Sequence, residues 1–167
     1  MLLGLVSDTH GFVHPRLAEA FADCDAILHA GDVGVGDSGR AVLDALRAVA
    51  PTTAVYGNID DAAMRRRLPE WVDVTLGGVR VRMTHIAGRP GRWATGLKAR
   101  LALDPPDVFV CGHSHRLQIE RVPGLGGMLF VNPGAAGQQG FHAEKTCVRL
   151  AVENGRAVRA DVVHLDG

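Results

Sequence analysis

The sequence predicts an α/β (α+β) fold in which two packed mixed β-sheets are flanked by helices, a four-layer αββα sandwich. In the first third of the chain, short apolar runs alternate with segments of helical spacing, a β-α-β-α-β order typical of parallel strands with helical crossovers. In the remainder, apolar runs follow one another across tight turns, which is typical of mixed or antiparallel pairing. No linker, internal repeat or low-complexity segment interrupts the 167 residues, so we expect a single domain over residues 1–167.

The first half alternates predicted strands with predicted helices. Each strand is an apolar run that ends at a polar residue, and each helix spaces its apolar residues three or four positions apart. Pro15 suits the first turn of one helix, Ser38 can cap the next, and Pro51 ends it. In chain order we expect a strand at 2–7, a helix at 15–22, a strand at 26–29, a helix at 38–50 and a strand at 52–56.

The second half consists mainly of predicted strands. Gly77-Gly78 and Asn154-Gly155 separate apolar runs, so each pair predicts a two-residue hairpin turn. The glycine-rich segments 34–39 and 134–140 are interpreted as loops that line a site. The expected elements are strands at 72–76 and 79–84, a helix at 94–103, and strands at 108–111, 117–122, 128–131, 146–152 and 157–164.

Charge and composition argue against several classes of partner. Lys plus Arg and Asp plus Glu both total 18, and this neutral balance argues against nucleic acid or an anionic membrane as partner. The basic run Arg65-Arg66-Arg67 is expected on a solvated helix face. The apolar start at residues 2–6 lacks a basic segment before it and is too short to span a membrane, so no signal peptide is predicted and the cytoplasm is the expected compartment.

Short polar motifs follow the predicted strands at the point where each strand ends. They are Asp-Thr-His, Gly-Asp, Gly-Asn, a single His, and Gly-His-Ser-His. Each alone is a weak signal, because such residues also form ordinary turns and caps. Together, carboxylate, amide and imidazole groups at one sheet edge predict a shared metal pocket. The candidate ligands are Asp8, His10, Asp32, Asn58, His85, His113 and His115.

This ligand set indicates the kind of metal and the number of ions. Oxygen donors mixed with imidazole nitrogens suit Mn²⁺, Fe or Zn²⁺ better than metals that prefer thiolates. The candidate groups exceed what one ion needs, and a bridging carboxylate would divide them into two sets of four. Two ions about 3.5–4 Å apart recur in phosphoester hydrolysis, where they generate hydroxide near neutral pH and neutralise charge on the phosphate.

In this order and at these distances, the motifs resemble the calcineurin-like metallophosphoesterase superfamily. The segments that carry the resemblance are SDTH, LHAGD, VYGNID, MTH, CGHSH and VNPGA, and they extend from residue 1 to about residue 136. They are most similar to the small single-domain bacterial and archaeal phosphodiesterase branch. The resemblance implies that residues 1–167 form one metallophosphoesterase domain, a β-sandwich flanked by helices.

The resemblance also implies roles for the candidate ligands. The implied function is hydrolysis of small phosphodiesters by a dinuclear metal-dependent phosphoesterase, through in-line attack of a metal-bridging hydroxide. Asp32, Asn58 and His10 are the expected catalytic residues. Mn²⁺ is the first expectation for the two divalent ions, with Fe, Ni²⁺ or Zn²⁺ as alternatives. The ligand sets would be Asp8, His10, Asp32 and His115 for one ion, and the bridging Asp32 with Asn58, His85 and His113 for the other.

The sequence departs from the family pattern beside two of these ligands. Many members have His after Gly-Asn, where it contacts the phosphate and can protonate the leaving group, whereas this chain has Ile59. An alkyl side chain does neither, so we expect a preference for esters with good leaving groups. His10 or a metal-bound water is then the candidate proton donor. Ile86 follows His85 where relatives frequently have Gly, and it would narrow that side of the pocket.

Other functional classes stay open at this stage. A non-catalytic metal-binding scaffold of the same fold would bind protein partners, as the retromer subunit with this fold does. Such scaffolds tend to lose ligands, whereas all seven positions are filled here. A metallo-β-lactamase-like chain would need HxHxDH and a zinc deaminase PCxxC, and both motifs are absent. Exposed sheet edges also allow a homodimer.

Three further polar residues are candidates for supporting roles. His29 lies within a predicted strand and either orients the ligands through a hydrogen bond or is a core histidine. Asp60 either braces the loop that carries Asn58 or only forms a turn. His142 follows a glycine-rich loop and could approach the substrate.

Overall fold

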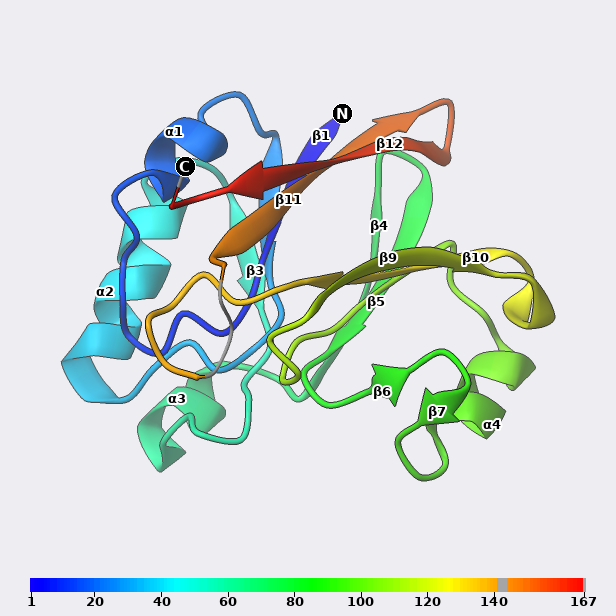
Figure 1. Ribbon diagram of the computed structural model, residues 1–167, viewed down its shortest axis with the longest axis horizontal. Coiled ribbons are helices and arrows are strands. Elements are labelled where there is room, and N and C mark those ends of the chain that lie inside the picture. The colour runs from blue at the N-terminus through cyan, green and yellow to red at the C-terminus, as the bar shows by residue number, and fades with distance from the viewer. Residues whose placement is uncertain (141–143, 167) are drawn as a thin grey trace.

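Two five-stranded sheets form the centre of the molecule, with helices against their outer faces (Figure 1). These features come from a computed structural model that describes residues 1–140 and 144–166. His142 therefore lies outside the described residues. The predicted class, two mixed sheets flanked by helices, is confirmed.

The first sheet combines the wound N-terminal strands with the C-terminal hairpin. Strands β1, β2 and β3 pair in parallel, as the β-α-β-α-β pattern predicts, and β11 pairs antiparallel with both β1 and β12. The C-terminal hairpin turns at Asn154-Gly155, also as predicted. The strand order is β12 (Arg156–His164), β11 (Thr146–Glu153), β1 (Leu2–Val6), β2 (Ala26–His29) and β3 (Thr52–Ala54).

The second sheet is also mixed. Strands β5, β8 and β10 are parallel to one another, and antiparallel strands close both edges. The turn at Gly77-Gly78 joins β4 and β5 as an antiparallel hairpin, which confirms that prediction. The strand order is β4 (Trp71–Leu76), β5 (Val79–Thr84), β8 (Val108–Val110), β10 (Met128–Pro133) and β9 (Leu117–Val122).

Three buried apolar clusters hold the layers together. Because side chains alternate between the faces of a strand, one strand supplies two clusters. In β2, Leu28 packs between the sheets, while Ile27 packs in the cluster that contains α1 (Leu17–Ala20) and α2 (Gly36–Arg47). In β8, Val110 packs between the sheets, while Phe109 packs against α4 (Leu97–Leu103). Both sheets are therefore covered on two faces, which gives the αββα order.

The helix boundaries differ from the predicted ones. Helix α1 is four residues long, and Pro15 lies in the turn before it rather than in its first turn. Helix α2 begins at Gly36, so part of the segment 34–39, interpreted as a loop, is helical. It ends at Arg47, and helix α4 begins at Leu97 rather than residue 94. The apolar spacing located these helices, but it could not locate their ends.

The cap of α2 is also different from the prediction. Ser38 lies inside the first turn, where its hydroxyl donates to the carbonyl oxygen of Val35 at 2.8 Å. The Asp61 carboxylate accepts the free N–H of Gly36 at 2.8 Å instead. A side chain distant in sequence thus satisfies the helix end, which sequence spacing cannot indicate.

Three small elements complete the described chain. Helix α3 (Ala62–Arg67) carries the basic run, and its three arginines are exposed, as predicted. The hairpin of β6 (Gly88–Arg89) and β7 (Arg92–Trp93) was not predicted, because strands of two residues are too short to show an alternating pattern. A 3₁₀ turn at Pro123–Leu125 precedes β10.

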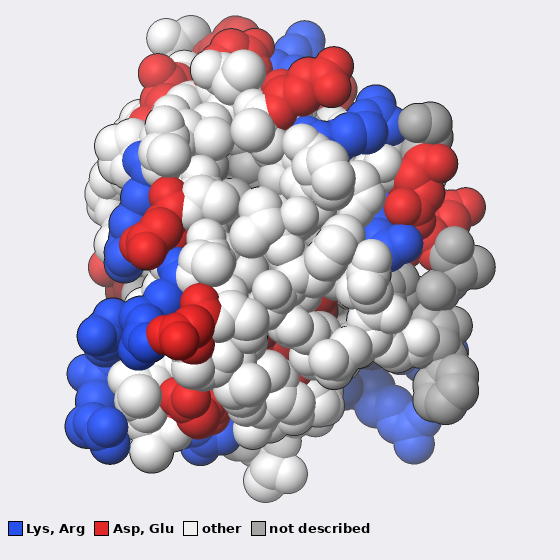
Figure 2. All heavy atoms as spheres, turned by 90° about the vertical axis from the view of Figure 1, so that its left-hand side faces the viewer, with Lys and Arg blue, Asp and Glu red and all other residues white. Residues whose placement is uncertain are grey.

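The side of the molecule that carries α1 and α2 has few charged residues at its centre. Figure 2 shows this helical side of the molecule, where charged residues lie toward the edges and uncharged residues occupy the middle. Among the described residues, no helix has the length and apolar character needed to cross a membrane.

Candidate metal centre

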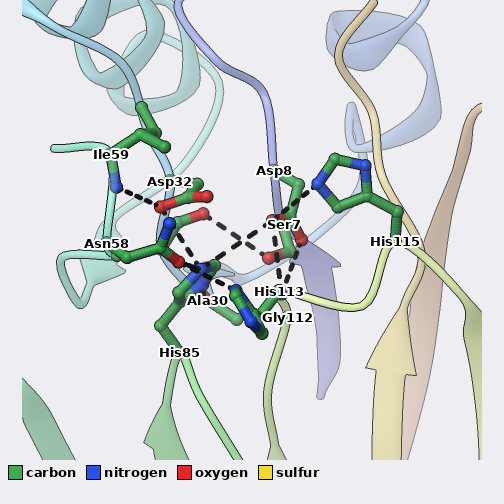
Figure 3. Close-up of polar contacts among 12 residues, drawn as sticks. Ser7, Asp8, Ala30, Asp32, Asn58, Ile59, His85, Gly112, His113 and His115 are labelled. Carbon is green, nitrogen blue, oxygen red and sulfur yellow. Dashed lines mark hydrogen bonds and ion pairs between the residues drawn. The ribbon is translucent and has the colours of Figure 1, made fainter. Parts of the chain in front are cut away.

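The structure brings all seven predicted ligands together where the strands of the two sheets end. Asp8 and His10 follow β1, Asp32 follows β2 and Asn58 follows β3, all in the first sheet. His85 follows β5, and His113 and His115 follow β8, in the second sheet. Figure 3 shows six of these side chains pointing toward one another, and the seventh, His10, lies against His115 and Asp32.

One group of contacts surrounds Asn58. Its Oδ1 lies 2.8 Å from His113 Nδ1 and 3.1 Å from His85 Nε2. His85 Nε2 also lies 3.2 Å from Asp32 Oδ1, and the backbone N–H of Ile59 donates to this oxygen at 3.0 Å. Asp32 and Asn58, from neighbouring strands, therefore present oxygens to the same imidazole.

A second group of contacts surrounds Asp8. Its carboxylate accepts the backbone N–H of His113 at 3.1 Å, and its Oδ1 lies 3.3 Å from His115 Nε2. His115 Nε2 lies 3.3 Å from His10 Nε2, which is in turn 3.8 Å from Asp32 Oδ2. The two oxygens of Asp32 thus face different groups, Oδ1 toward His85 and Oδ2 toward His10.

The donor chemistry of these groups fits divalent cations. His85 Nδ1 lies 2.8 Å from the carbonyl oxygen of Ala30, which only accepts, so this nitrogen carries the ring proton. The lone pair on Nε2 then faces acceptor oxygens of Asp32 and Asn58, and only a proton or a cation between them makes the contact favourable. His10 and His115 likewise oppose two ring nitrogens. Two subsets have ligand atoms within 4.8 Å of one another: Asp8, His10 and His115, and Asp8, Asp32 and His85.

The charges of this cluster shift the pKa values of its members. Burial alone would raise the pKa of Asp32, but the hydrogen bond and charge of His85 and the N–H of Ile59 outweigh it, so the pKa is lowered. The hydrogen bond to Asp8 raises the pKa of His115. Burial opposes the charged form of His85, yet Asp32 and Asp8 raise its pKa. Protons and metal ions compete for these imidazoles, so metal binding weakens as pH falls.

The backbone at the predicted ligands is unusual. Among the described residues, six that are not glycine have positive φ, and five of them are predicted ligands. The sixth, Asn154, lies in a hairpin turn. Left-handed backbone is disfavoured for side chains with a Cβ atom and concentrates at functional sites. The five ligands are Asp8 (54°), His10 (50°), Asp32 (53°), His113 (69°) and His115 (57°).

Glycines in the motifs make room for neighbouring ligands. A Cβ atom at Gly57 would overlap the Asp32 carboxylate, and one at Gly112 would overlap Ser7 Oγ and lie 2.7 Å from Asp8 Oδ2. Gly57 precedes Asn58, and Gly112 precedes His113. The Gly-Asn and Gly-His motifs therefore each combine a ligand with the space for a ligand from another strand.

His29 supports the loops that carry Asp8, His10 and Asp32. Its Nδ1 accepts the N–H of Gly31 at 3.2 Å, so the ring proton is on Nε2, which donates to Thr9 Oγ1 at 2.9 Å. Thr9 Oγ1 donates to the carbonyl oxygen of Val33 at 2.9 Å. His29 is fully buried, and burial lowers its pKa to about 4, so the ring is neutral. These hydrogen bonds agree with the interpretation that His29 orients the ligand loops, rather than with that of a core histidine without such a role.

The loop that carries Asn58 is held from both ends. Asp60 is 3% exposed and accepts the N–H groups of Gly34 at 2.8 Å and Gly57 at 2.7 Å, so it braces this loop as one interpretation predicted. Burial raises its pKa despite these bonds. Arg65 donates to the carbonyl oxygens of Asn58 and Asp60, both at 2.8 Å. The sequence pattern missed this role of Arg65, because an arginine in a basic run gives no sign of which group it contacts.

A pocket of about 210 Å³ opens beside Asn58 and His85. We call it the α3 pocket; it is lined by the side chains of Tyr56, Asn58, Arg65, Glu70, His85 and Ile86. Ile86 is 47% exposed and contributes the apolar wall expected at this position. Ile59 is 36% exposed.

Comparison with known proteins gives one family. The calcineurin-like phosphoesterase superfamily domain matches residues 1–155. A probable metallophosphoesterase of Methanothermobacter thermautotrophicus is 33% identical over 145 residues, which are 81% of this chain and 77% of the relative. A probable metallophosphoesterase of Methanocaldococcus jannaschii is 31% identical over 143 residues, 81% of this chain and 68% of the relative.

Solved structures share the fold. An archaeal phosphodiesterase has a TM-score of 0.77 and 22% identity, with 98% of this chain and 99% of that chain covered. Vps29 of Chaetomium thermophilum has a TM-score of 0.72 and 19% identity, with 98% and 97% covered. Vps29 of Entamoeba histolytica in complex with Zn²⁺ has a TM-score of 0.70 and 19% identity, with 99% of both chains covered. At these identities the likeness concerns the fold alone.

Proposed function

Because this chain belongs to the calcineurin-like phosphoesterase superfamily, we propose that it is a dinuclear metal-dependent phosphodiesterase of small phosphodiesters. The observation that carries this proposal is the convergence of seven nitrogen and oxygen donors on one pocket, with the oxygens of Asp32 facing two different groups. The proposed unit is one metallophosphoesterase domain, residues 1–167, that acts in the cytoplasm.

We propose the following division of the ligands. The bridging role of Asp32 is supported by the 3.2 Å from Oδ1 to His85 and the 3.8 Å from Oδ2 to His10. Mn²⁺ is the first candidate for both ions, with Fe, Ni²⁺ and Zn²⁺ as alternatives, because the donors are oxygens and imidazole nitrogens. One ion would be held by Asp8, His10, Asp32 and His115, and the other by Asp32, Asn58, His85 and His113.

The residues of the proposed metal centre have separate roles in binding and orienting the substrate. Divalent cations held by these residues would lower the pKa of a water molecule and would so supply hydroxide as the nucleophile for in-line attack on phosphorus. Asn58 Oδ1 faces His85 and His113, which leaves its Nδ2 to donate to a phosphoryl oxygen. The Ile59 N–H fixes the rotamer of Asp32. The proposed catalytic residues are His10, as the candidate proton donor, Asp32, as the bridging ligand, and Asn58, as the contact to the phosphate.

A metal-binding scaffold without catalysis is the second candidate function. The Vps29 structures, one of them in complex with Zn²⁺, support it because they share the fold. The left-handed backbone at five proposed ligands supports a functional metal site, which both candidates require, since strain of this kind persists where it serves a function.

Hydrolysis of bis-p-nitrophenyl phosphate tests the proposal. Metal-stripped protein should be inactive, added Mn²⁺ should restore turnover, and Asp32→Asn should lower kcat by about 10³-fold or more, because charge stabilisation at the reacting phosphate is lost. Asp44→Asn, on the exposed side of α2, is the matched control and should keep full activity. Absence of turnover with Mn²⁺, Ni²⁺ and Zn²⁺, in protein shown to bind two ions, would reject the enzyme in favour of the scaffold.

A further inference from the structure

A second pocket, of about 270 Å³, adjoins the metal centre at His113. Its charge differs from that of the α3 pocket, and we call it the arginine pocket. Its walls come from the β6–β7 hairpin, which Figure 1 labels, and from the segment that follows β8. It is lined by the side chains of Arg89, Arg92, His113, Ser114, Arg116 and Gln118.

The lining of this pocket is positively charged, whereas the whole chain is neutral. The whole sequence balances 18 basic against 18 acidic residues, yet the pocket contains three arginines and no carboxylate. Arg89, Arg92 and Arg116 are all exposed. Within the described residues, no carboxylate forms an ion pair with any of them. Other arginines on the second sheet are paired, such as Arg80 and Arg82 with Asp73. The three guanidinium groups are therefore free to bind an external anion.

Two of these arginines are placed where they repel each other. Arg89 lies directly opposite Arg92 in the β6–β7 ladder. Like charges opposite each other across a two-stranded ribbon destabilise it. This arrangement disfavours the folded hairpin on its own, and an anion bound between the two side chains would remove the repulsion.

The hairpin is nevertheless fixed in position. Trp93 packs edge-on against Phe130 in the core between β10 and α4, with ring centroids 5.7 Å apart. A Cβ atom at Gly88 would overlap the carbonyl oxygen of Arg92, so glycine allows the close approach of the two strands. The N–H of Ala94 donates to the carbonyl oxygen of Ala87 at 2.9 Å and closes the base of the hairpin.

The opposite wall is tied to the metal centre. Asn132 is buried and donates to the carbonyl oxygen of Gly112 at 2.9 Å and to Ser114 Oγ at 3.0 Å. His113, a proposed metal ligand, lines the pocket itself. An anion in the pocket would thus lie next to the proposed metal centre, at a position fixed relative to it.

We propose that the arginine pocket binds a second phosphate group of the substrate. The preferred substrate is then a small phosphodiester that carries another phosphate close to the scissile bond, an inference that rests on the proposed function. Guanidinium groups recognise phosphate through paired, charge-assisted hydrogen bonds, and three of them around one pocket select a doubly charged group over a neutral one.

The test compares two substrates with the same scissile bond and leaving group. Thymidine 5′-(p-nitrophenyl phosphate) has one phosphate, and its 3′-phosphorylated form has two. With Mn²⁺-loaded protein, kcat/KM should be at least about tenfold higher for the 3′-phosphorylated ester, mainly through a lower KM. In the double variant Arg89→Gln/Arg92→Gln, which keeps Arg116, this ratio should fall toward one.

The control is Arg47→Gln, which removes an exposed arginine at the end of α2 and should keep the full ratio. Equal kcat/KM for the two esters, or a ratio that the double variant retains, would overturn the proposal. If neither ester is hydrolysed, the proposed function fails and the pocket is tested by itself. Calorimetry should then show thymidine 3′,5′-bisphosphate binding to metal-free protein more tightly than thymidine 5′-monophosphate, and equal binding would overturn the proposal.

Discussion

The two sides of the metal centre use their arginines differently. On the α3 pocket side, Arg65 contacts other groups of the protein, since it donates to backbone carbonyl oxygens and lies over the ring of Tyr56. On the arginine pocket side, Arg89 and Arg92 have no carboxylate partner among the described residues. The first side is built to hold a ligand loop in place, and the second to receive an anion. A charged substituent of the substrate therefore fits the arginine pocket better than the α3 pocket.

The largest test of this comparison concerns the leaving group. Ile86 lines the α3 pocket and Ile59 follows Asn58 in the chain, and neither alkyl side chain can protonate a poor leaving group. Aryl phosphodiesters should be hydrolysed at least about 100-fold faster than alkyl ones at fixed Mn²⁺. An alkyl leaving group needs a general acid, whose contribution is at least of this size, and an aryl leaving group does not. Comparable turnover of both would contradict this. Glu70→Gln would then show whether the Glu70 carboxyl group, which also lines the pocket, supplies the proton.

The support beneath both sides should depend on pH. His29 has a pKa of about 4 in the folded protein, below the ordinary histidine value of 6.5, so the unfolded chain binds a proton more readily. The contribution of neutral His29 to the free energy of unfolding is therefore fully present above pH 6.5 and is lost as pH falls toward 4. Between pH 7.5 and 5.0 the free energy of unfolding of metal-free protein should drop by about 2 kcal/mol more than in His29→Gln. Urea denaturation at both pH values measures this, and equal drops would contradict it.

A smaller effect is expected from the loop on the α3 side. Arg65→Gln loses the hydrogen bonds to the carbonyl oxygens of Asn58 and Asp60, so Asn58 is held less firmly. We expect about a tenfold loss in kcat and weaker binding of one of two Mn²⁺ ions in a metal titration. Arg66→Gln is the matched control, because Arg66 is the next residue of the same helix and is exposed. The same behaviour in both variants would refute the positioning role of Arg65.

The smallest effect is a gain in stability on the other side. Arg92→Gln removes the repulsion with Arg89 and should raise the free energy of unfolding by about 0.2–1 kcal/mol at low ionic strength. The gain should disappear in high salt, which screens exposed charges. Arg159→Gln serves as control, because Arg159 is already paired with Asp161. A loss of stability in Arg92→Gln would indicate that the hairpin is held together by a contact of this arginine.

The sequence was most informative where one local pattern determines the outcome. Apolar runs that end at polar residues located β1, β2, β3, β5 and β8, and with them the seven residues that converge in the structure. Helix ends were less predictable, because contacts distant in sequence set them, as Asp61 does for Gly36. Arg65, Arg89 and Arg92 were missed as site residues for a related reason. An exposed arginine looks the same in sequence whether it braces a loop, faces another arginine or points into solvent.

The left-handed backbone of the proposed ligands has a consequence for the history of the protein. Each such residue disfavours the folded state by on the order of 1 kcal/mol, and five of them do so together. Glycine at any of these positions would relieve the strain. A descendant that no longer needed the site would therefore gain stability by losing these residues, and random substitution would remove them early. We therefore expect that relatives which have lost the activity have replaced Asp8, His10, Asp32, His113 or His115 before residues of ordinary backbone conformation.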